Sequence, residues 1–185
     1  MSANDHASTI DGSVYCIEAI PVTADKLTAS AQTLGWDQSF LVTKAVISNT
    51  LGDVYFRSED SVGIEHLGID NCEKLKSNPE EFNRVCRKVD VYTLDNFMHN
   101  IAKKSDAVID ILSIDVEGYD FYVILGGKAT IGKAKYLEFE YNWMGSWQDQ
   151  KLMDAIDLLD NLHFTCYRAG DERLWRIDQS CWMEH

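Results

Sequence analysis

The sequence is short of several features that would assign it to a specialised class of protein. Only two of its 185 residues are proline, and it has no proline-rich linker or low-complexity tract. No apolar run approaches the roughly 18 residues that a membrane-spanning helix needs. Positive charge is also scarce, because 17 Lys and Arg stand against 30 Asp and Glu, giving a net charge of −13. We therefore expect no membrane span and no binding to nucleic acid or to an anionic membrane surface, since such partners would be repelled.

Metal-binding and redox motifs are missing as well. The cysteines are Cys16, Cys72, Cys86, Cys166 and Cys181, and they form no C-x-x-C pair. The five histidines show neither H-x-x-x-H nor H-E-x-x-H spacing. These absences argue against a zinc ribbon, a thioredoxin-type site and a zincin helix, and we expect no metal. The odd number and wide spacing of the cysteines predict reduced, mostly buried thiols in a cytoplasmic protein.

The composition is that of a globular protein of one domain. Apolar residues make up 45% of the chain and charged residues 25%, and the length suits a single core. Residues 1–13 are polar and lack the cationic and apolar regions of a signal peptide. We expect a polar tail over residues 1–13, followed by one α/β domain over residues 14–185.

Short apolar runs alternate with helical patterns along this domain. The runs expected to form strands are residues 14–17, 40–47, 54–56, 89–92, 108–114 and 136–141. Helices are expected from Pro21 to Gly35, through residues 122–125 and over residues 152–159, and Thr93 can cap a further helix that follows it. Residues 57–85 are expected to be irregular with one short helix. Residues 164–167 and 174–177 resemble a closing antiparallel pair. The alternation predicts a Rossmann-like α/β fold, with a twisted, mainly parallel sheet covered by helices on both faces.

Ligands of such sheets bind outside the carboxyl ends of the strands, so the polar residues there are the candidates for function. Glu18 suits a ribose, because a carboxylate accepts hydrogen bonds from both hydroxyls. Taken alone, Glu18 is more simply explained as a solvated carboxylate or a charge at the start of the next helix. Asp115 and Glu117 follow another strand, and either could instead cap the helix from Tyr119.

Several segments together resemble the FkbM-type S-adenosylmethionine-dependent methyltransferases. They are VYCIEAIPVTADKLTAS, KAVISNTLGDVYF, VDVYTLDNF, IDILSIDVEGYDFYVILGGKATI and YLEFEYNW. The resemblance spans residues 14–165, and the combination of TLD with DVEG at this spacing is its most specific part. It implies the class I methyltransferase fold and methyl transfer from S-adenosylmethionine, usually to an oxygen of a sugar or a small metabolite.

The resemblance also implies roles for individual residues. The cofactor-binding candidates are Glu18 and Ala19 at the ribose, Val46 and Ser48 at the adenine, and Asp115, Glu117 and Gly118 near the methionine end. An acidic lining suits the sulfonium cation, which a carboxylate attracts. A base that removes the proton of the acceptor hydroxyl would assist the transfer. Glu140, Asn142 and His66 are the catalytic candidates, by position only.

Two features depart from the family pattern. Ser113 stands where the family often carries lysine. A glycine-rich loop should precede the ribose-binding acidic residue by about 20 residues, and counting back from Glu18 runs past Met1. Residues 1–13 contain no G-x-G and no apolar run suited to a strand. We therefore expect the sheet to lack its first strand, and the chain to bind S-adenosylmethionine weakly or not at all.

Three functions stay open on this basis. The leading one is an S-adenosylmethionine-dependent methyltransferase that methylates an oxygen of a sugar or small hydroxylated metabolite, with that small molecule as its partner. The alternative is a catalytically inactive or truncated methyltransferase-fold domain that acts as a binding or interaction module. A nucleotide-binding Rossmann protein of another kind is less well supported, because neither a P-loop nor G-x-G-x-x-G is present. The sequence does not specify the acceptor or the oligomeric state.

Overall fold

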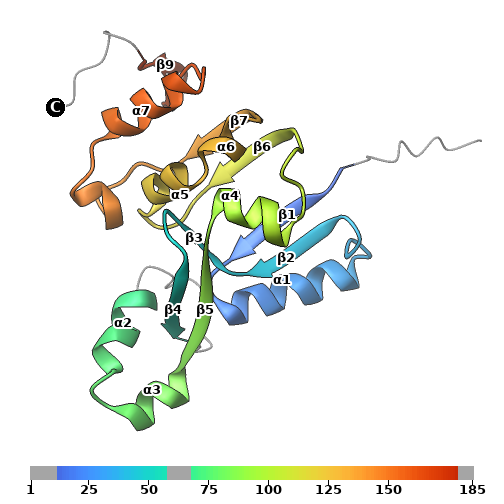
Figure 1. Cartoon of the computed structure of the whole chain (residues 1–185), viewed down its shortest axis with the longest axis vertical. Helices are drawn as coiled ribbons and strands as arrows, with labels where there is room; N and C mark the ends of the chain where they lie inside the picture. The colour runs from blue at the N-terminus through green and yellow to red at the C-terminus, as the bar shows by residue number, and fades with distance from the viewer. Residues whose placement is uncertain (1–11, 58–67, 179–185) are drawn as a thin grey trace, which may run out of the picture. The chain divides into compact units, whose positions relative to one another are not determined.

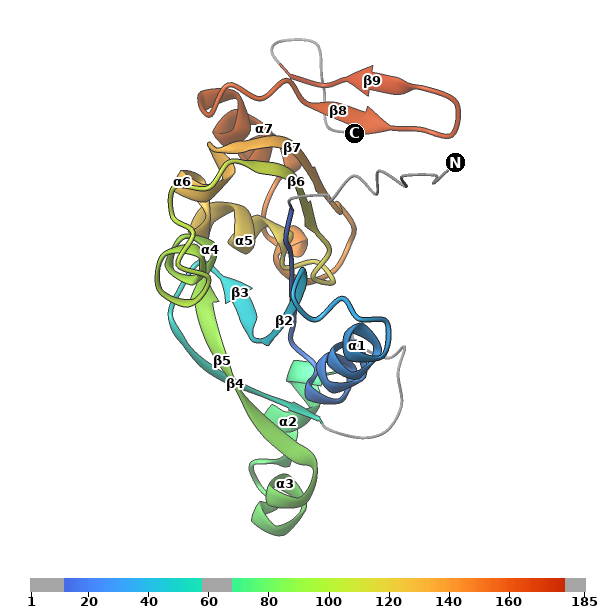
Figure 2. The same cartoon turned by 90° about the vertical axis from the view of Figure 1, so that its right-hand side faces the viewer.

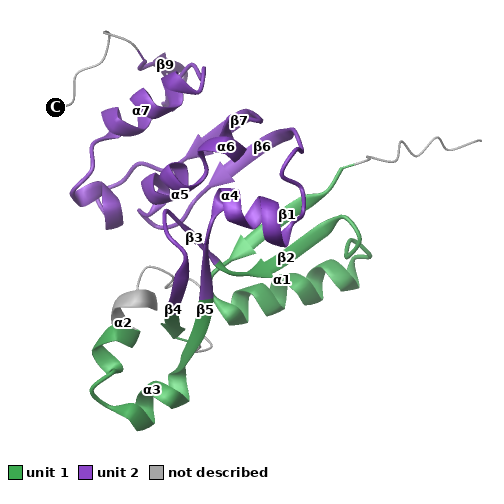
Figure 3. Cartoon of the chain, in the orientation of Figure 1, with its two compact units in different colours: residues 1–45, 55–89 green, residues 46–54, 90–185 purple. Residues whose placement is uncertain are grey.

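The protein is described here by a computed structural model that covers residues 12–57 and 68–178. Figure 1 shows an alternation of helices and strands along the chain. The chain divides into two compact units, which are coloured separately in Figure 3. Unit 1 comprises residues 1–45 and 55–89, and unit 2 comprises residues 46–54 and 90–185. Strands β4 (Gly52–Arg57) and β5 (Cys86–Thr93) each run from one unit into the other.

Unit 1 begins with a β-α-β segment that agrees with the sequence pattern. Strand β1 (Val14–Glu18) pairs in parallel with β2 (Phe40–Lys44), and helix α1 (Pro21–Thr33) connects them. Pro21 starts the helix, where its missing N–H breaks no hydrogen bond. Ala24 and Ala31 are buried on one side of the helix. Gly35 follows the helix with φ 70°, a conformation that favours glycine.

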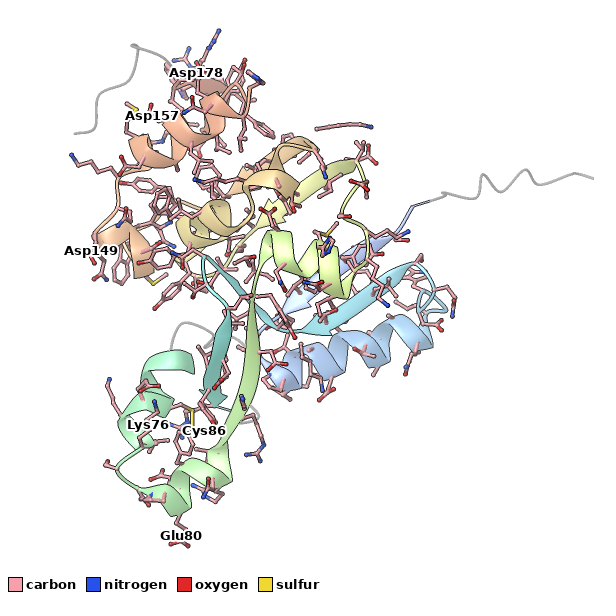
Figure 4. The ribbon with its side chains drawn as sticks, viewed as in Figure 1. Lys76, Glu80, Cys86, Asp149, Asp157 and Asp178 are labelled. Atoms are coloured by element: carbon pink, nitrogen blue, oxygen red, sulfur yellow. A yellow bond between two sulfur atoms is a disulfide. The ribbon has the colours of Figure 1, made fainter. Side chains whose placement is uncertain are left out.

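The rest of unit 1 contains two helices and a disulfide bond. Residues 57–85 were expected to hold one short helix, whereas α2 (Gly68–Leu75) and α3 (Pro79–Val85) both form there. Cys72 and Cys86 are joined by a disulfide, so the expectation of reduced thiols is wrong for this pair; Figure 4 marks its position at Cys86. Cys16 and Cys166 are free thiols.

The disulfide compensates for a small core. The buried residues of this cluster are Cys72, Val85 and Cys86, and the partly buried side chains packed against them are Tyr55, Leu75 and Phe82. Such a cluster buries little apolar surface for a region that must order two helices. A cross-link between residues 14 apart in sequence reduces the entropy of the unfolded chain, which stabilises the region by about 3 kcal/mol.

Unit 2 contains two parallel strand pairs. Strand β3 (Val46–Ser48) pairs with β5, and β6 (Ile109–Ile114) pairs with β7 (Ala134–Phe139). Helices α5 (Asp120–Gly126) and α6 (Lys128–Ile131) connect β6 to β7, as a parallel crossover requires. The remaining elements are α4 (Leu94–Asn96), the π-helix η2 (Phe97–Ile101), the 3₁₀-helix η3 (Gly145–Gln148), α7 (Leu152–Asn161), β8 (Tyr167–Ala169) and β9 (Leu174–Arg176).

The predicted α/β class is confirmed, but the described strands do not form a single sheet. They form four small sheets, in the orders β1-β2, β3-β5-β4, β6-β7 and β8-β9. The apolar run over residues 40–47 is interrupted at Ala45, which separates β2 from β3. The last sheet is antiparallel, as predicted. Within residues 12–57 and 68–178, no helix combines the length and apolar character needed to cross a membrane.

Two residues of the TLD segment, Thr93 and Asp95, hydrogen-bond the starts of α4 and α6. Thr93 Oγ1 accepts a hydrogen bond of 3.1 Å from Asn96 N and so caps α4, as the sequence predicts. The carboxylate of Asp95 accepts hydrogen bonds from Ala129 N (3.1 Å) and Thr130 N (2.7 Å) at the start of α6. Thr93 thus acts within its own helix, whereas Asp95 holds a segment more than 30 residues away.

Candidate functional site

The carboxyl ends of β6 and β7 lie side by side in unit 2. Ile114 pairs with Phe139 at the last position of the register, so Asp115 and Glu140 follow at the same edge. Both carboxylates are exposed. No lysine or arginine occurs in residues 111–127 or 136–150, so no cation from these two segments neutralises the edge. The result is an acidic edge at the position where sheets of this kind bind ligands.

The turn after β6 has an unusual backbone conformation. Glu117 and Gly118 have φ values of 53° and 88°, and a non-glycine residue rarely adopts a positive φ. A Cβ atom on Gly118 would lie 2.5 Å from Met144 O, which is closer than a carbon atom can approach. Gly118 is therefore required both by its φ and by the chain that passes beside it.

The turn is clamped to the segment that follows β7. The peptide oxygen of Gly118 accepts two hydrogen bonds of 2.8 Å, one from Ser146 N and one from Ser146 Oγ. Gly145, with φ 56°, packs against the same peptide group, and a Cβ there would lie 2.6 Å from Gly118 O. Because the hydroxyl and both peptide groups are buried or half-buried, the contact fixes the two loops relative to each other.

A network of hydrogen bonds orients Glu140. Asn142 Nδ2 donates to Glu140 Oε2 at 2.8 Å, and Asn142 Oδ1 accepts from Met144 N at 2.8 Å. The indole of Trp147 is 5% exposed and donates from Nε1 to Glu140 O at 3.1 Å. The Trp147 ring also packs on Tyr141, with the centroids 5.0 Å apart. Among the described residues, none donates a hydrogen bond to Glu140 Oε1.

Asp120 is the most perturbed carboxyl group of this region. It is 0% exposed, and its Oδ1 accepts a hydrogen bond of 3.2 Å from Glu140 N. Its Oδ2 is buried and has no hydrogen-bond partner among the described residues. Burial is the main reason why its pKa rises from 3.8 to about 6, and the negative charges of Asp115 and Glu140 raise the pKa further. Two backbone hydrogen bonds act in the opposite direction.

Asp120 was not among the residues predicted from the sequence. Asp115 or Glu117 could have capped the next helix, but the N-cap of α5 is Tyr119 and no described side chain caps this helix. The signal for Asp120 was a carboxyl group in the first turn of a helix that follows the DVEG turn. Its hydrogen bond comes from Glu140 N, which lies 20 residues later, directly after β7.

The other predicted residues lie in several places. Glu18 and Ala19 are in unit 1, where Glu18 Oε1 accepts a hydrogen bond of 2.7 Å from Ile20 N just before α1. This contact is the helix-start role considered for Glu18. Val46 and Ser48 are in β3 of unit 2, and Ser48 contacts Gly126 at the far end of α5.

The structure therefore brings together some of the predicted residues and separates others. Those assembled at the ends of β6 and β7 are Asp115, Glu117, Gly118, Glu140 and Asn142. Ser48 is not part of this group, because it lies beside Gly126 at the carboxyl end of α5, whereas the group lies near the start of that helix. His66 lies outside the described residues. The Ser113 hydroxyl, at the position where lysine was expected, donates to Glu138 Oε1 at 2.8 Å across the strands.

The chemistry of the assembled groups is acidic and free of an evident metal cluster. In the part of the chain that the structure describes, no group of three or more His, Cys, Asp or Glu side chains could hold a metal ion. The edge offers exposed carboxylates that can attract a cationic ligand. It also presents the amide of Asn142, and Glu140 Oε1 accepts no hydrogen bond from the described residues. The edge also holds one buried carboxyl group, Asp120, whose pKa burial raises to about 6.

Comparison with known proteins yields one match. The family model described as the Methyltransferase FkbM domain matches residues 6–168, which include the acidic edge and both of its clamped loops. Searches of the curated proteins and of the solved structures found no match.

Proposed function

The chain belongs to the Methyltransferase FkbM domain family, and from this premise we propose that it transfers a methyl group from S-adenosylmethionine to a hydroxyl oxygen of a small acceptor, such as a sugar or a hydroxylated metabolite. The observation that carries the proposal is the acidic edge at the ends of β6 and β7. Asp115 and Glu140 directly follow these two paired strands, and neither flanking segment contains a lysine or arginine.

The side chains of this edge fit a cationic cofactor. A sulfonium ion is attracted by an exposed carboxylate, and Asp115 is exposed and forms no hydrogen bond with the described residues. Within unit 2, Asp115 and Glu117 would hold the methionine end of the cofactor, and Val46 and Ser48 would hold the adenine. When bound, S-adenosylmethionine supplies an electrophilic methyl group.

Glu140 is the best placed base. Asn142 occupies Oε2 and fixes the orientation of the carboxylate, while Oε1 can accept the proton of the acceptor hydroxyl as that oxygen is methylated. Asp120 and Trp147 bind the backbone N–H and C=O of Glu140, so the position of the base is set from both sides. Holding the hydroxyl in line with the methyl group supplies the proximity effect.

Equilibrium binding to S-adenosylmethionine and S-adenosylhomocysteine tests the proposal. We expect Asp115→Asn to weaken binding of the sulfonium compound by about tenfold and to leave the neutral thioether unchanged, because only the former carries the attracted charge. Asp37→Asn, at an exposed carboxylate of unit 1, is the matched control. Isothermal titration measures both affinities.

An inactive binding module is the second candidate, and one observation favours it. Glu18 already uses one carboxylate oxygen to hold Ile20 N at the start of α1, a role that needs no ribose. This candidate predicts that neither compound binds at millimolar concentration and that Glu18→Ala affects stability alone. A full-length chain that behaved in this way would contradict the methyltransferase proposal.

A further inference from the structure

The hairpin of β8 and β9 projects from unit 2 with none of its residues buried. Tyr167 pairs with Arg176, Arg168 with Trp175, and Ala169 with Leu174, and all six side chains are exposed. Figure 2 shows the two strands extending beyond α7. A two-stranded hairpin is marginally stable by itself in water. This one is anchored at its base, where Ile177 N donates to Cys166 O at 3.0 Å and Ile177 is buried.

The composition of the hairpin is that of a protein interface. Three of the six arginines of the chain are in it, at Arg168, Arg173 and Arg176. Leu174 is 65% exposed and Trp175 is 50% exposed. Tryptophan, tyrosine and arginine are the residues most enriched at interface hot spots, whereas such exposed apolar groups are costly in water.

Two of these arginines are available for a partner. The Arg176 guanidinium binds the Asp178 carboxylate at 2.5 Å. Arg168 and Arg173 form no ion pair with any described residue. Arg173 stacks on Trp175, with its Cζ 3.6 Å from the ring centroid, so the aromatic ring and the charge are held together before a partner arrives.

Helix α7 of the same unit presents the opposite charge. Asp154, Asp157 and Asp160 are spaced by three residues, are exposed, and lie on a helix with no lysine or arginine. Asp154 binds Lys151 N at the start of the helix, whereas the carboxylates of Asp157 and Asp160 form no hydrogen bond or ion pair with the described residues. Figure 4 labels Asp157 on this helix.

We propose that this face is the interface of a homodimer, in which the hairpin of each copy packs against α7 of the other. A two-fold interface must be self-complementary, and unit 2 carries both the unpaired arginines and the unpaired aspartates that such contacts need. The hairpin also has a net charge of +1 in a chain of −13, so an acidic copy of this chain is a partner that it attracts. Within one copy, the described residues show no ion pair between Arg168 or Arg173 of the hairpin and an aspartate of α7.

Sedimentation of the full chain at micromolar concentration gives the first test. We expect the mass of two 21.0 kDa chains, and a weaker dimer in high salt. Trp175→Ser should weaken the dimer at least about tenfold, as removal of a hot spot does. Trp36→Ser, at a tryptophan of similar exposure in unit 1, should leave it unchanged.

A charge exchange gives a sharper test. Arg168→Glu/Arg173→Glu and Asp157→Lys/Asp160→Lys should each be monomeric, because like charges then face each other. An equimolar mixture of the two should form a heterodimer, since the reversed hairpin meets the reversed helix and the native hairpin meets the native helix. Lys26→Glu/Lys74→Glu, with the same net charge as the first variant, should remain a homodimer.

Circular dichroism and thermal unfolding should show that all variants are folded, since every substituted side chain is exposed. A monomeric wild-type chain would overturn the proposal. So would a dimer that the hairpin variants do not weaken, or a mixture of the two charge variants that stays monomeric. None of these results depends on methyl transfer, so the dimer and the proposed activity are tested separately.

Discussion

Replacement of Asp120 by asparagine should remove a defined part of the pH dependence of stability. The pKa of Asp120 rises from 3.8 to about 6 in the folded chain, chiefly because the carboxyl group is buried. The folded state therefore holds this proton more tightly than the unfolded state does. The stabilisation is fully present below the unfolded pKa and is lost as the pH rises through the folded pKa.

The magnitude follows from the shift. A shift of about two pKa units corresponds to about 3 kcal/mol between strongly acidic and alkaline pH. The part lost between about pH 5 and about pH 7.5 is about 1.4 kcal/mol, because much of the proton is already released from the unfolded state at the lower pH. Asparagine keeps an oxygen that can accept from Glu140 N but does not titrate, so this loss should disappear.

Urea-induced unfolding, followed by circular dichroism at several pH values, measures the effect. The useful quantity is the difference in the free energy of unfolding between Asp120→Asn and the wild type at each pH, because the other carboxyl groups titrate in both proteins. Asp149→Asn, at an exposed carboxyl group of unit 2, should follow the wild-type profile. Parallel profiles for Asp120→Asn and the wild type would refute the assignment of a buried, proton-retaining carboxyl group.

Two further predictions concern the backbone and the disulfide. Gly118→Ala should destabilise the chain by at least about 2 kcal/mol in thermal unfolding, because it adds a clashing Cβ at a positive φ, whereas Gly52→Ala has open space and should cost far less. Cys72→Ser/Cys86→Ser should lower the stability of unit 1 by about 3 kcal/mol, and peptide mapping without reduction should recover the linked pair from the wild type. Recovery of both cysteines as free thiols would contradict the pairing.

The elements that the sequence predicted best are those set by near neighbours. The start of α1 at Pro21 and the Thr93 cap of α4 both depend on residues within a single turn of helix. The same holds for β1 and for the apolar stripe of α7, where a short-range period decides the structure. Such features need no knowledge of the tertiary fold.

The features that escaped prediction depend on distant contacts. The Cys72–Cys86 bond exists because α2 and α3 contact each other, and a spacing of 14 residues does not reveal that contact. Asp120 accepts a hydrogen bond from the backbone N–H of Glu140, which lies 20 residues later in the sequence. The interruption at Ala45 is invisible in a continuous apolar run, since periodicity alone does not show where one strand pair gives way to another.

These long-range contacts also explain why the family pattern consists of separated segments. Asp95 of TLD holds α6, Gly118 of DVEG packs against Gly145, and Asp120 binds the backbone of Glu140. In each of these contacts, one residue belongs to one segment of the pattern. Its partner lies in another segment or in η3, the helix after the last segment. Much of the pattern is therefore required for folding, whatever the chemistry.

Asp115 differs from these motif residues because no hydrogen bond within the described part of the chain depends on its carboxylate. Loss of function after substitution of Gly118 or Asp120 would mix a structural effect with a chemical one. Asp115→Asn should leave the clamped loops intact and remove one negative charge from the acidic edge. An affinity that falls for the sulfonium compound and not for the thioether in Asp115→Asn would therefore report on cofactor recognition itself.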